Sequence, residues 1–172
     1  PTPVIGGIGL IKDLSHSTGM KINKNDSIYL VGEHLGHLEL SEFNRVCNNN
    51  QGDPPPLNLK KELKYGLFIK DFIENNNDIV SGCHDLSDGG LMIALAELAI
   101  KNNKGIEIKT PNFVKKIEEW YFSEDQARYL IVINDDDKLK KMAKFKKIQI
   151  QKVGIVRGNS FSIINRFEIS IK

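Results

Sequence analysis

The segment SGCHDLSDGGL, residues 81–91, gathers side chains that can do chemistry between two apolar runs. It holds one imidazole, two carboxylates, two hydroxyls and two adjacent glycines. Mg²⁺ takes carboxylate ligands together with phosphate oxygens, so Asp85 is a candidate metal ligand. Gly89 and Gly90 have no side chain to block an approaching phosphate, and the Ser87 hydroxyl can donate to a phosphate oxygen. The segment therefore predicts a site for a metal ion and a phosphate group.

A simpler interpretation applies to part of this segment. A helix is predicted to begin directly after Asp88, and the first amides of a helix are unpaired. Asp88 or Ser87 can cap such a helix, which contributes about 1 kcal/mol. We favour the capping role for Asp88. A cap needs only one such residue, so Asp85 keeps the metal and phosphate hypothesis.

A second polar group, FSEDQ at residues 122–126, precedes another apolar run. Ser123 and Gln126 have the spacing of a capping box, but a strand is predicted almost at once, so no helix follows to be capped. Arg128 is the next charged residue, so the segment predicts a salt-bridged turn. The alternative is a turn that binds hydroxyl or phosphate groups of a ligand, with Glu124 among its acceptors.

Three other groups of residues do not match the pattern of a known kind of site. His34 and His37 are three apart in a glycine-rich stretch without helical periodicity, so their spacing does not make a zinc site. Residues 6–9, GGIG, lack the third glycine and the helix of a dinucleotide fingerprint. Cys83 and His84 are neighbours on a predicted strand, where adjacent side chains point to opposite faces.

Regular elements must position these candidates. An apolar run at 79–83 predicts a strand before the first segment, and an apolar stripe predicts a helix at 89–102 after it. A strand at 128–134 follows the second. Further strands are predicted at 4–11, 27–31, 105–109, 148–156 and 160–165, and helices at 41–45, 57–75, 111–121 and 135–147.

Two of these predictions carry detail that structure can test. In the helix at 57–75, the apolar positions at helical spacing are Leu59, Leu63, Leu67, Phe68 and Phe72. A turn at 157–159 joins the last two strands and gives an antiparallel finish. The alternation of strands and helices predicts an α+β fold with a mixed β-sheet covered by helices.

The composition is that of a single globular domain over residues 1–172, with 40% hydrophobic and 27% charged residues. The net charge of +2, from 24 basic and 22 acidic residues, does not favour a nucleic-acid partner. No apolar run approaches the ~18 residues of a membrane span. Cys47 and Cys83 lack metal-finger spacing, which is typical of free thiols in the cytoplasm. The chain starts with Pro-Thr-Pro and no Met, which suggests a fragment of a longer polypeptide.

Five segments carry a resemblance to a known family. In chain order they are PTPVIGGIGLI, LELSEF, PPLNL, SGCHDLSDGGLMIALAELAI and FSEDQARYLIVI. The chain resembles the C-terminal domain of the enzymes related to aminoimidazole ribonucleotide synthetase. Within that group it is most similar to the last domain of phosphoribosylformylglycinamidine synthases. The resemblance covers nearly the whole chain, although residues 34–40, HLGHLEL, are not the glycine-rich form typical of the family.

The resemblance implies an activity. These synthases are ATP-dependent ligases of purine biosynthesis that make formylglycinamidine ribonucleotide from formylglycinamide ribonucleotide, glutamine and ATP. It also implies partners, namely an N-terminal ATP-binding half, a glutaminase domain or subunit and the small ribonucleotide substrate. This chain lacks both the ATP-binding half and the glutaminase, so the isolated domain is expected to be inactive.

The resemblance also implies site residues and cofactors, with no catalytic residue in this domain. Asp85 matches a Mg²⁺ ligand, and Ser87, with Gly89 and Gly90, matches a contact to ATP or ADP. The matching positions for contact with the ribonucleotide substrate are Ser123, Glu124 and Gln126. Two alternatives stay open: a non-catalytic scaffold domain that holds a structural nucleotide, and another superfamily member such as aminoimidazole ribonucleotide synthetase or a selenophosphate synthetase relative.

Overall fold

The computed structural model describes residues 6–11, 13–47 and 51–171. The strands are β1 (Ser27–Val31), β2 (Val80–Asp85), β3 (Ile106–Ile108), β4 (Tyr129–Ile133), β5 (Ile150–Val156), β6 (Ser160–Ile163) and β7 (Phe167–Ser170). The helices are α1 (Glu42–Cys47), α2 (Leu59–Asn75), α3 (Gly90–Asn102), α4 (Ile117–Phe122) and α5 (Asp136–Lys146), with a short 3-10 helix, η1, at Leu14–His16.

The strands form one sheet in the order β2-β4-β1-β5-β3-β6-β7. Every neighbouring pair is antiparallel except β3 and β6, which are parallel. The predicted α+β fold with a mixed sheet is thereby confirmed. The prediction for the end of the chain was wrong in one respect, because β3 lies between β5 and β6. The antiparallel finish is made instead by β6 with β7, a strand that was not predicted.

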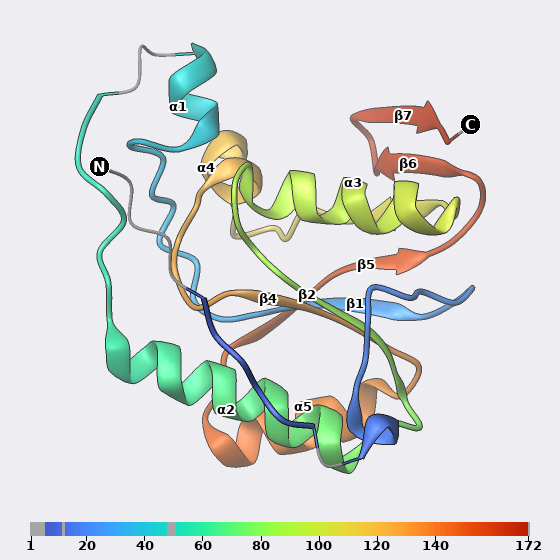
Figure 1. The fold of residues 1–172 in the computed structure, drawn as a ribbon. Coiled ribbons are helices and arrows are strands. Elements are labelled where there is room, and N and C mark those ends of the chain that lie inside the picture. Colours follow the sequence, from blue (N-terminus) through green and yellow to red (C-terminus); the bar gives the residue numbers. More distant parts are fainter. Residues whose placement is uncertain (1–5, 12, 48–50, 172) are drawn as a thin grey trace.

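Helices cover both faces of this sheet (Figure 1). The helices α3 and α4 lie over one face, and α2 and α5 lie over the other. Every residue of β1 is buried, because its side chains alternate between two cores. Ile28 and Leu30 belong to the core under α3, whereas Tyr29 and Val31 belong to the core under α2.

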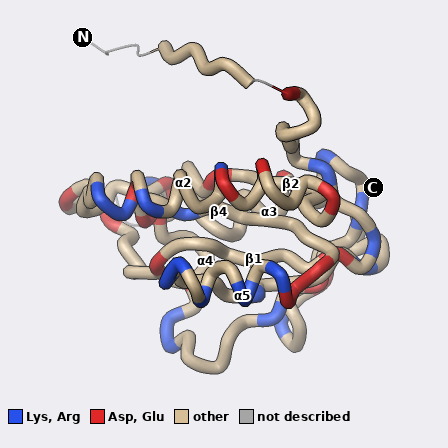
Figure 2. The backbone as a smooth tube through the Cα atoms, turned by 90° about the horizontal axis from the view of Figure 1, so that it is seen from below, with Lys and Arg blue, Asp and Glu red and all other residues tan. Residues whose placement is uncertain are grey.

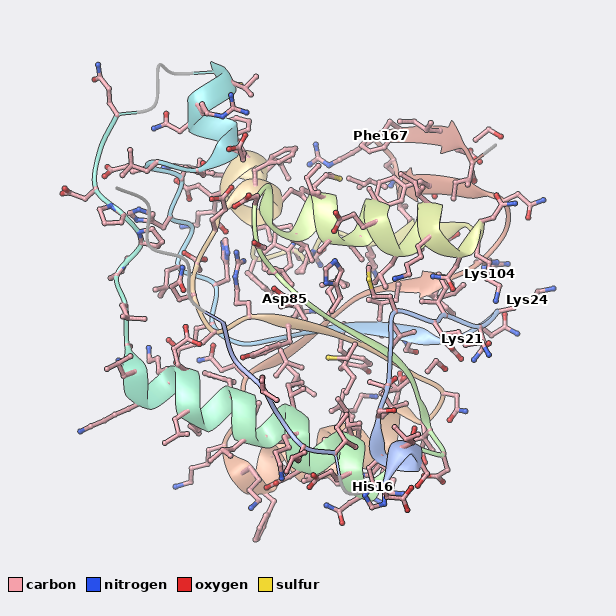
Figure 3. All side chains as sticks on the ribbon, viewed as in Figure 1. His16, Lys21, Lys24, Asp85, Lys104 and Phe167 are labelled. Carbon is pink, nitrogen blue, oxygen red and sulfur yellow. The ribbon has the colours of Figure 1, made fainter. Side chains whose placement is uncertain are left out.

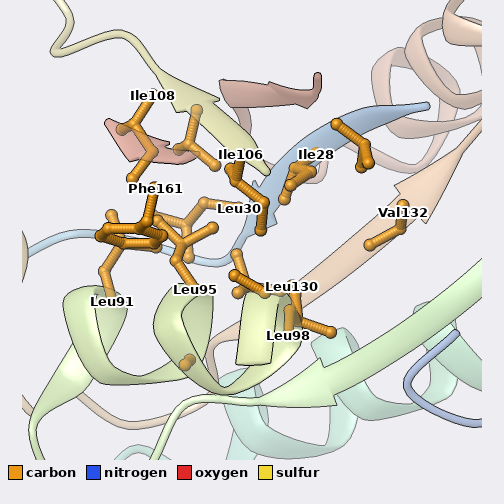
Figure 4. Packing of buried hydrophobic residues seen from close by; sticks show 14 of the residues in the cluster. Ile28, Leu30, Leu91, Leu95, Leu98, Ile106, Ile108, Leu130, Val132 and Phe161 are labelled. Atoms are coloured by element: carbon orange, nitrogen blue, oxygen red, sulfur yellow. The ribbon is translucent and has the colours of Figure 1, made fainter. Parts of the chain in front are cut away.

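The stripe predicted on the helix after residue 89 forms the centre of the first core. Leu91, Leu95 and Leu98 of α3 are fully buried against the central strands (Figure 4). Burying a leucine side chain contributes about 1.5–3 kcal/mol relative to leaving it exposed. These three residues therefore fix α3, and the loop that precedes it, to the sheet.

Helix α2 confirms the predicted element but not all of its predicted buried face. Phe68 and Phe72 are buried, whereas Leu59, Leu63 and Leu67 are exposed, Leu63 at 64%. The buried face is made by Tyr65, Phe68, Ile69 and Phe72. Apolar residues occupy two faces of this helix, so helical periodicity alone did not identify the face that meets the sheet.

The strand predicted at 4–11 does not form in its described part. Residues 4 and 5 lie outside the described residues, and residues 6–11 are exposed and belong to no strand. Figure 2 shows this segment extending away from the body of the domain. Ile8 and Leu10 therefore contribute nothing to either core. Among the described residues, no helix is both long and apolar enough to cross a membrane.

Candidate functional site

Three strand ends bring the two predicted segments to the same end of the sheet. Tyr129, at the start of β4, pairs with Val31 at the end of β1 and with Asp85 at the end of β2. The turn at 122–126 leads into β4, so it lies beside the loop that follows β2. Figure 3 shows Asp85 at this end, with Lys21 and Lys104 at the opposite end.

Asp85 presents a carboxylate to solvent. Its side chain is 70% exposed, and its Oδ1 lies 3.3 Å from Nδ1 of His84. The other ring nitrogen of His84, Nε2, lies 2.8 Å from Oε2 of Glu97 on α3. The half-buried imidazole thus links β2 to α3 and leaves most of the Asp85 carboxylate accessible to a ligand.

The start of α3 differs from the capping prediction. The N-cap is Gly89, with φ +78° and no side-chain hydrogen bond, so the capping role assigned to Asp88 or Ser87 was wrong. Asp88 and Ser87 are both exposed. Ser87 contributes only its carbonyl oxygen, which accepts from the Gly90 amide at 3.0 Å. Its hydroxyl stays at the surface of the loop.

Gly90 is required by a close approach of two backbones. Its φ is +62°, and a Cβ added there would lie 2.3 Å from the carbonyl oxygen of Ser123. Any larger residue would combine an unfavourable backbone conformation with a clash. The second glycine of the loop therefore serves the packing of the loop against the turn at 122–126.

Glu124 connects three segments of this region. Its Oε1 accepts from the backbone amides of Gly89 at 2.7 Å and of Glu42 at 2.9 Å. Its own amide donates to the carbonyl oxygen of His37 at 3.1 Å. The carboxylate oxygen that was predicted to contact substrate is thus bonded to the loop before α3 and to the first turn of α1.

Asp125, a member of the predicted turn at 122–126 to which no separate role was assigned, holds the loop at 34–37. Its Oδ2 accepts from the amides of Leu35 at 2.8 Å and Gly36 at 3.0 Å, and its Oδ1 accepts from the amide of His37 at 3.0 Å. Three backbone donors aimed at one carboxylate fix the path of the chain after β1. An acid three residues before an arginine at a strand start was the signal available in the sequence.

Arg128 completes the turn and is itself buried. Its Nη1 lies 3.7 Å from Oδ2 of Asp125, and its Nε donates to the Asp125 carbonyl oxygen at 3.1 Å. Its Nη2 donates to the carbonyl oxygen of Ser123. These contacts confirm the interpretation of residues 122–126 as a salt-bridged turn.

The buried charges of Asp125 and Arg128 stabilise each other. Burial alone raises the pKa of Asp125, but the contacts with His34, Arg128 and the loop amides outweigh it and hold that pKa well below its usual range. Burial lowers the pKa of Arg128, against the opposing effect of Asp125. The buried pair is ionised at neutral pH because each charge lies beside its counterpart.

The remaining predicted site residues have different surroundings. Ser123 is fully buried, and its hydroxyl donates to Oδ2 of Asp125 at 3.2 Å. Gln126 is exposed and lines a cavity of about 220 Å³ together with Glu33 and Tyr65. Of the three positions, Gln126 is therefore the one with a side chain open to a ligand.

The described residues can supply part of a magnesium site. Among them, no three His, Cys, Asp or Glu side chains are grouped so that they could hold a metal ion. Mg²⁺ is commonly held by one or two carboxylates, with waters and phosphate oxygens as its other ligands. The exposed Asp85 carboxylate fits that arrangement. His34 and His37 do not form a joint site, since His34 faces Asp125 and Nε2 of His37 lies 2.9 Å from the Asp53 carbonyl oxygen.

Curated proteins match this chain along its whole length. The phosphoribosylformylglycinamidine synthase subunit PurL of Rhodopseudomonas palustris (strain HaA2) is 36% identical over 176 residues, covering 100% of this chain and 24% of the relative. The subunit PurL of Bartonella henselae is 41% identical, covering 99% of this chain and 23% of the relative. The chain therefore spans about a quarter of the length of these relatives.

Solved structures share the fold. The structure described as T. maritima PurL complexed with FGAR matches with a TM-score of 0.69 and 18% identity, covering 89% of this chain and 28% of that chain. The thiamine-monophosphate kinase of Stenotrophomonas maltophilia matches with a TM-score of 0.54 and 13% identity, covering 86% of this chain and 52% of that chain. At these identities the matches establish the fold alone.

A family model matches residues 23–164, which hold every strand but β7 and all of the helices α1 to α5. Its description is AIR synthase related protein, C-terminal domain. The loop with Asp85 and the turn with Arg128 both lie inside the matched range. This chain belongs to the family of AIR synthase related proteins, as a C-terminal domain of that type.

Proposed function

We propose that this chain is the C-terminal domain of a phosphoribosylformylglycinamidine synthase of the PurL type. The observation that carries the proposal is the match to PurL subunits, at 36–41% identity over 99–100% of this chain. The longer protein would be an ATP-dependent ligase of purine biosynthesis that uses glutamine as amide donor. The chain matches about a quarter of such a protein, so we expect it to be inactive alone.

We propose that the exposed end of the sheet holds nucleotide phosphates together with Mg²⁺. Structures of T. maritima PurL were solved with ATP and with ADP, which supports a nucleotide as ligand. Asp85 would be the metal ligand, and the exposed Ser87 hydroxyl would donate to a phosphate oxygen. Bound Mg²⁺ would neutralise phosphate charge, and Asp85 would fix its position.

Gly89 and Gly90 would shape the loop of this site, because neither residue has a side chain. Their amides are bonded to Glu124 and to the Ser87 carbonyl oxygen, respectively. A Cβ on Gly89 would meet Ile93 at 2.2 Å, and a Cβ on Gly90 would meet the Ser123 carbonyl oxygen at 2.3 Å, so the two glycines would set the path of the loop that contacts the phosphate. Glu124 and Ser123 would support the loop, and Gln126 would be the residue of the turn that reaches the ribonucleotide.

The partners follow from the part of the relatives that this chain does not match. We propose an N-terminal ATP-binding half in the same polypeptide and a glutaminase domain or subunit that delivers ammonia. One solved neighbour is described as PurLQS from Thermotoga maritima, which supports an assembly with other subunits. Cys47 and Cys83 are free thiols, which supports the cytoplasm as the location.

The test is Asp85→Ala in the full-length parent protein. We expect less Mg²⁺-dependent nucleotide to remain bound after purification, because the exposed carboxylate contributes a metal ligand. Asp88→Ala is the matched control, since Asp88 is an exposed carboxylate in the same loop. Equal nucleotide content in both variants and the parent would refute the assignment of Asp85.

The same variant separates catalysis from a scaffold role. If the nucleotide is structural, Asp85→Ala will lower the melting temperature of the parent and leave kcat nearly unchanged. If the nucleotide is consumed, kcat will fall as well. The 70% exposure of the Asp85 side chain favours the structural role.

A further inference from the structure

A second cavity, of about 650 Å³, lies at the same end of the sheet as Asp85 but over other strands. It is bounded by the end of β1, the start of β5, α4 and α5, whereas Asp85 ends β2, two strands away in the sheet order. Its walls include Gly32, His34, Phe113, Trp120, Lys140 and Lys144. A volume of this size falls in the range of small-molecule sites, about 300–1,000 Å³.

The charged side chains in the walls of this cavity are basic. Lys140 and Lys144 stand one helical turn apart on α5, and no aspartate or glutamate is among the lining residues. Figure 2 shows basic residues recurring along α5. Within the described part of the chain, no acidic side chain pairs with Lys144. Lys140 is only loosely paired, at 3.8 Å from Asp136 and 3.9 Å from Asp137. The cavity therefore favours an anion.

One ring nitrogen in the walls lacks a hydrogen-bond partner. In the ranges that the structure describes, the buried Nε1 of Trp120 has none, whereas the Nδ1 of His34 lies 3.6 Å from Oδ2 of Asp125. Trp120 is 1% exposed, so water does not satisfy its N–H. Buried polar groups in folded proteins are nearly always paired, and an exception calls for an explanation such as a ligand.

The cavity also has an aromatic wall. Phe113 is 61% exposed, and its ring meets the ring of Trp120 edge-on, with centroids 5.7 Å apart and an interplanar angle of 88°. On the other side of Trp120, the ring of His34 lies 4.9 Å away at 75°. The exposed phenyl ring of Phe113 gives the cavity an aromatic surface against which a flat ligand can pack.

We propose that this cavity binds a phosphate carried on a flat ring, with the size of a nucleoside monophosphate. The phosphate would lie beside Lys140 and Lys144, and the ring would pack on Phe113 within reach of the unpaired Nε1 of Trp120. No carboxylate lines the cavity, so binding does not need a divalent cation. This site uses residues different from those of the proposed Mg²⁺ and nucleotide site and goes beyond that proposal.

The chain carries its own reporter for the experiment, because Trp120 is its single tryptophan. AMP is titrated into the 172-residue chain in the presence of EDTA, and tryptophan fluorescence and the indole N–H resonance are followed. A dispersed amide spectrum recorded beforehand verifies the fold. We expect a saturable change with AMP, and much weaker changes with adenosine alone or with inorganic phosphate alone.

Matched variants locate the binding site. Lys144→Ala removes one charged contact and is expected to weaken AMP binding about tenfold. Lys146→Ala is the control, because Lys146 lies on the same helix, is exposed and does not line the cavity. Phe113→Ala is expected to weaken AMP more than phosphate. Asp85→Ala is expected to leave AMP binding in EDTA unchanged.

Several results would overturn the proposal. One is the absence of any change at Trp120 up to millimolar AMP, and another is equal affinity in the Lys144 and Lys146 variants. Equal binding of adenosine and AMP would exclude the anion subsite, and equal binding of phosphate and AMP would exclude the ring subsite. Loss of AMP binding in Asp85→Ala would assign the signal to the loop that holds Asp85. None of these results bears on the Mg²⁺-dependent retention of nucleotide by the full-length protein.

Discussion

At the scale of single residues, Asp125 and Arg128 together hold the backbone of the site in place through more hydrogen bonds than any residue predicted to touch a ligand. Asp125 holds the loop at 34–37 through three amides, and Arg128 holds the turn through two carbonyl oxygens. Both side chains are buried, so each charge depends on the other. Removing one partner of such a pair leaves an uncompensated charge in the interior.

The first prediction follows from this dependence. Asp125→Asn keeps the shape of the side chain but removes its charge, so we expect the free energy of unfolding to fall by about 3–5 kcal/mol. Urea unfolding measures this change. Asp137→Asn, at an exposed carboxylate on α5, is the control and should change stability by less than about 0.5 kcal/mol. A similar small change in both variants would contradict the role given to Asp125.

The pH dependence of stability has a defined sign. The pKa of Asp125 is lower in the folded than in the unfolded state, so its contribution is complete above the unfolded value of about 4. As the pH falls below that value, the unfolded chain takes up a proton that the folded chain resists, and stability declines. Urea midpoints measured from neutral to about pH 3 should fall less steeply in Asp125→Asn than in the parent.

At the scale of elements, α2 and α3 show what helical periodicity can and cannot predict about the buried face of a helix. Both helices were predicted, and the buried stripe of α3 was identified correctly. On α2 the leucines at 59, 63 and 67 face solvent, and the aromatic residues face the sheet. The difference arises because α3 has a single continuous apolar stripe that includes Leu91, Leu95 and Leu98, whereas α2 has apolar residues on two faces.

A matched pair of variants tests the two faces of α2. Phe72 is 0% exposed, so Phe72→Ala should lower the free energy of unfolding by about 3–5 kcal/mol. Leu63→Ala on the exposed face should change it by less than about 0.5 kcal/mol, since alanine favours a helix at least as well as leucine. Chemical denaturation of both variants provides the measurement. A large loss in Leu63→Ala alone would mean that the exposed face is covered in solution.

The sequence predicted elements better than it predicted contacts. Strong local patterns identified β1, β2, β4, α3 and α5, and the loop between β2 and α3 was found from its residue types. Two of the failures were non-local. Nothing near β6 shows that β3 will pair beside it, and nothing near Glu124 shows that its carboxylate will reach Gly89. Such contacts join residues far apart in the chain, whereas periodicity reports only on neighbours.

At the scale of the whole molecule, one sheet separates two cores that share the same strands. In β4, Leu130 and Val132 belong to the core under α3, and Ile131 and Ile133 belong to the core under α2. The residues of β4 that face one core cannot unfold while their neighbours in the same strand stay packed in the other core. The two cores should therefore unfold together.

This coupling gives a prediction at the same scale. Phe72 lies in the core under α2, and the single tryptophan, Trp120, lies in the core under α3. In Phe72→Ala, the fluorescence of Trp120 should report the same lowered midpoint as the far-UV circular dichroism. Separate midpoints for the two signals would show that the sheet does not couple its two faces.

The hydrogen bonds of Glu124 bear on how this domain can change over evolutionary time. One carboxylate oxygen serves both Gly89 and Glu42, and the backbone of Gly90 packs on Ser123. The loop with Asp85 and the turn with Glu124 thus depend on each other for their packing and hydrogen bonds, although about 35 residues separate them in the chain. Exchanging only one of them with a distant homologue should leave unpaired amides or a steric clash. Exchanging both together should preserve these contacts. The two motifs are expected to be inherited as a unit.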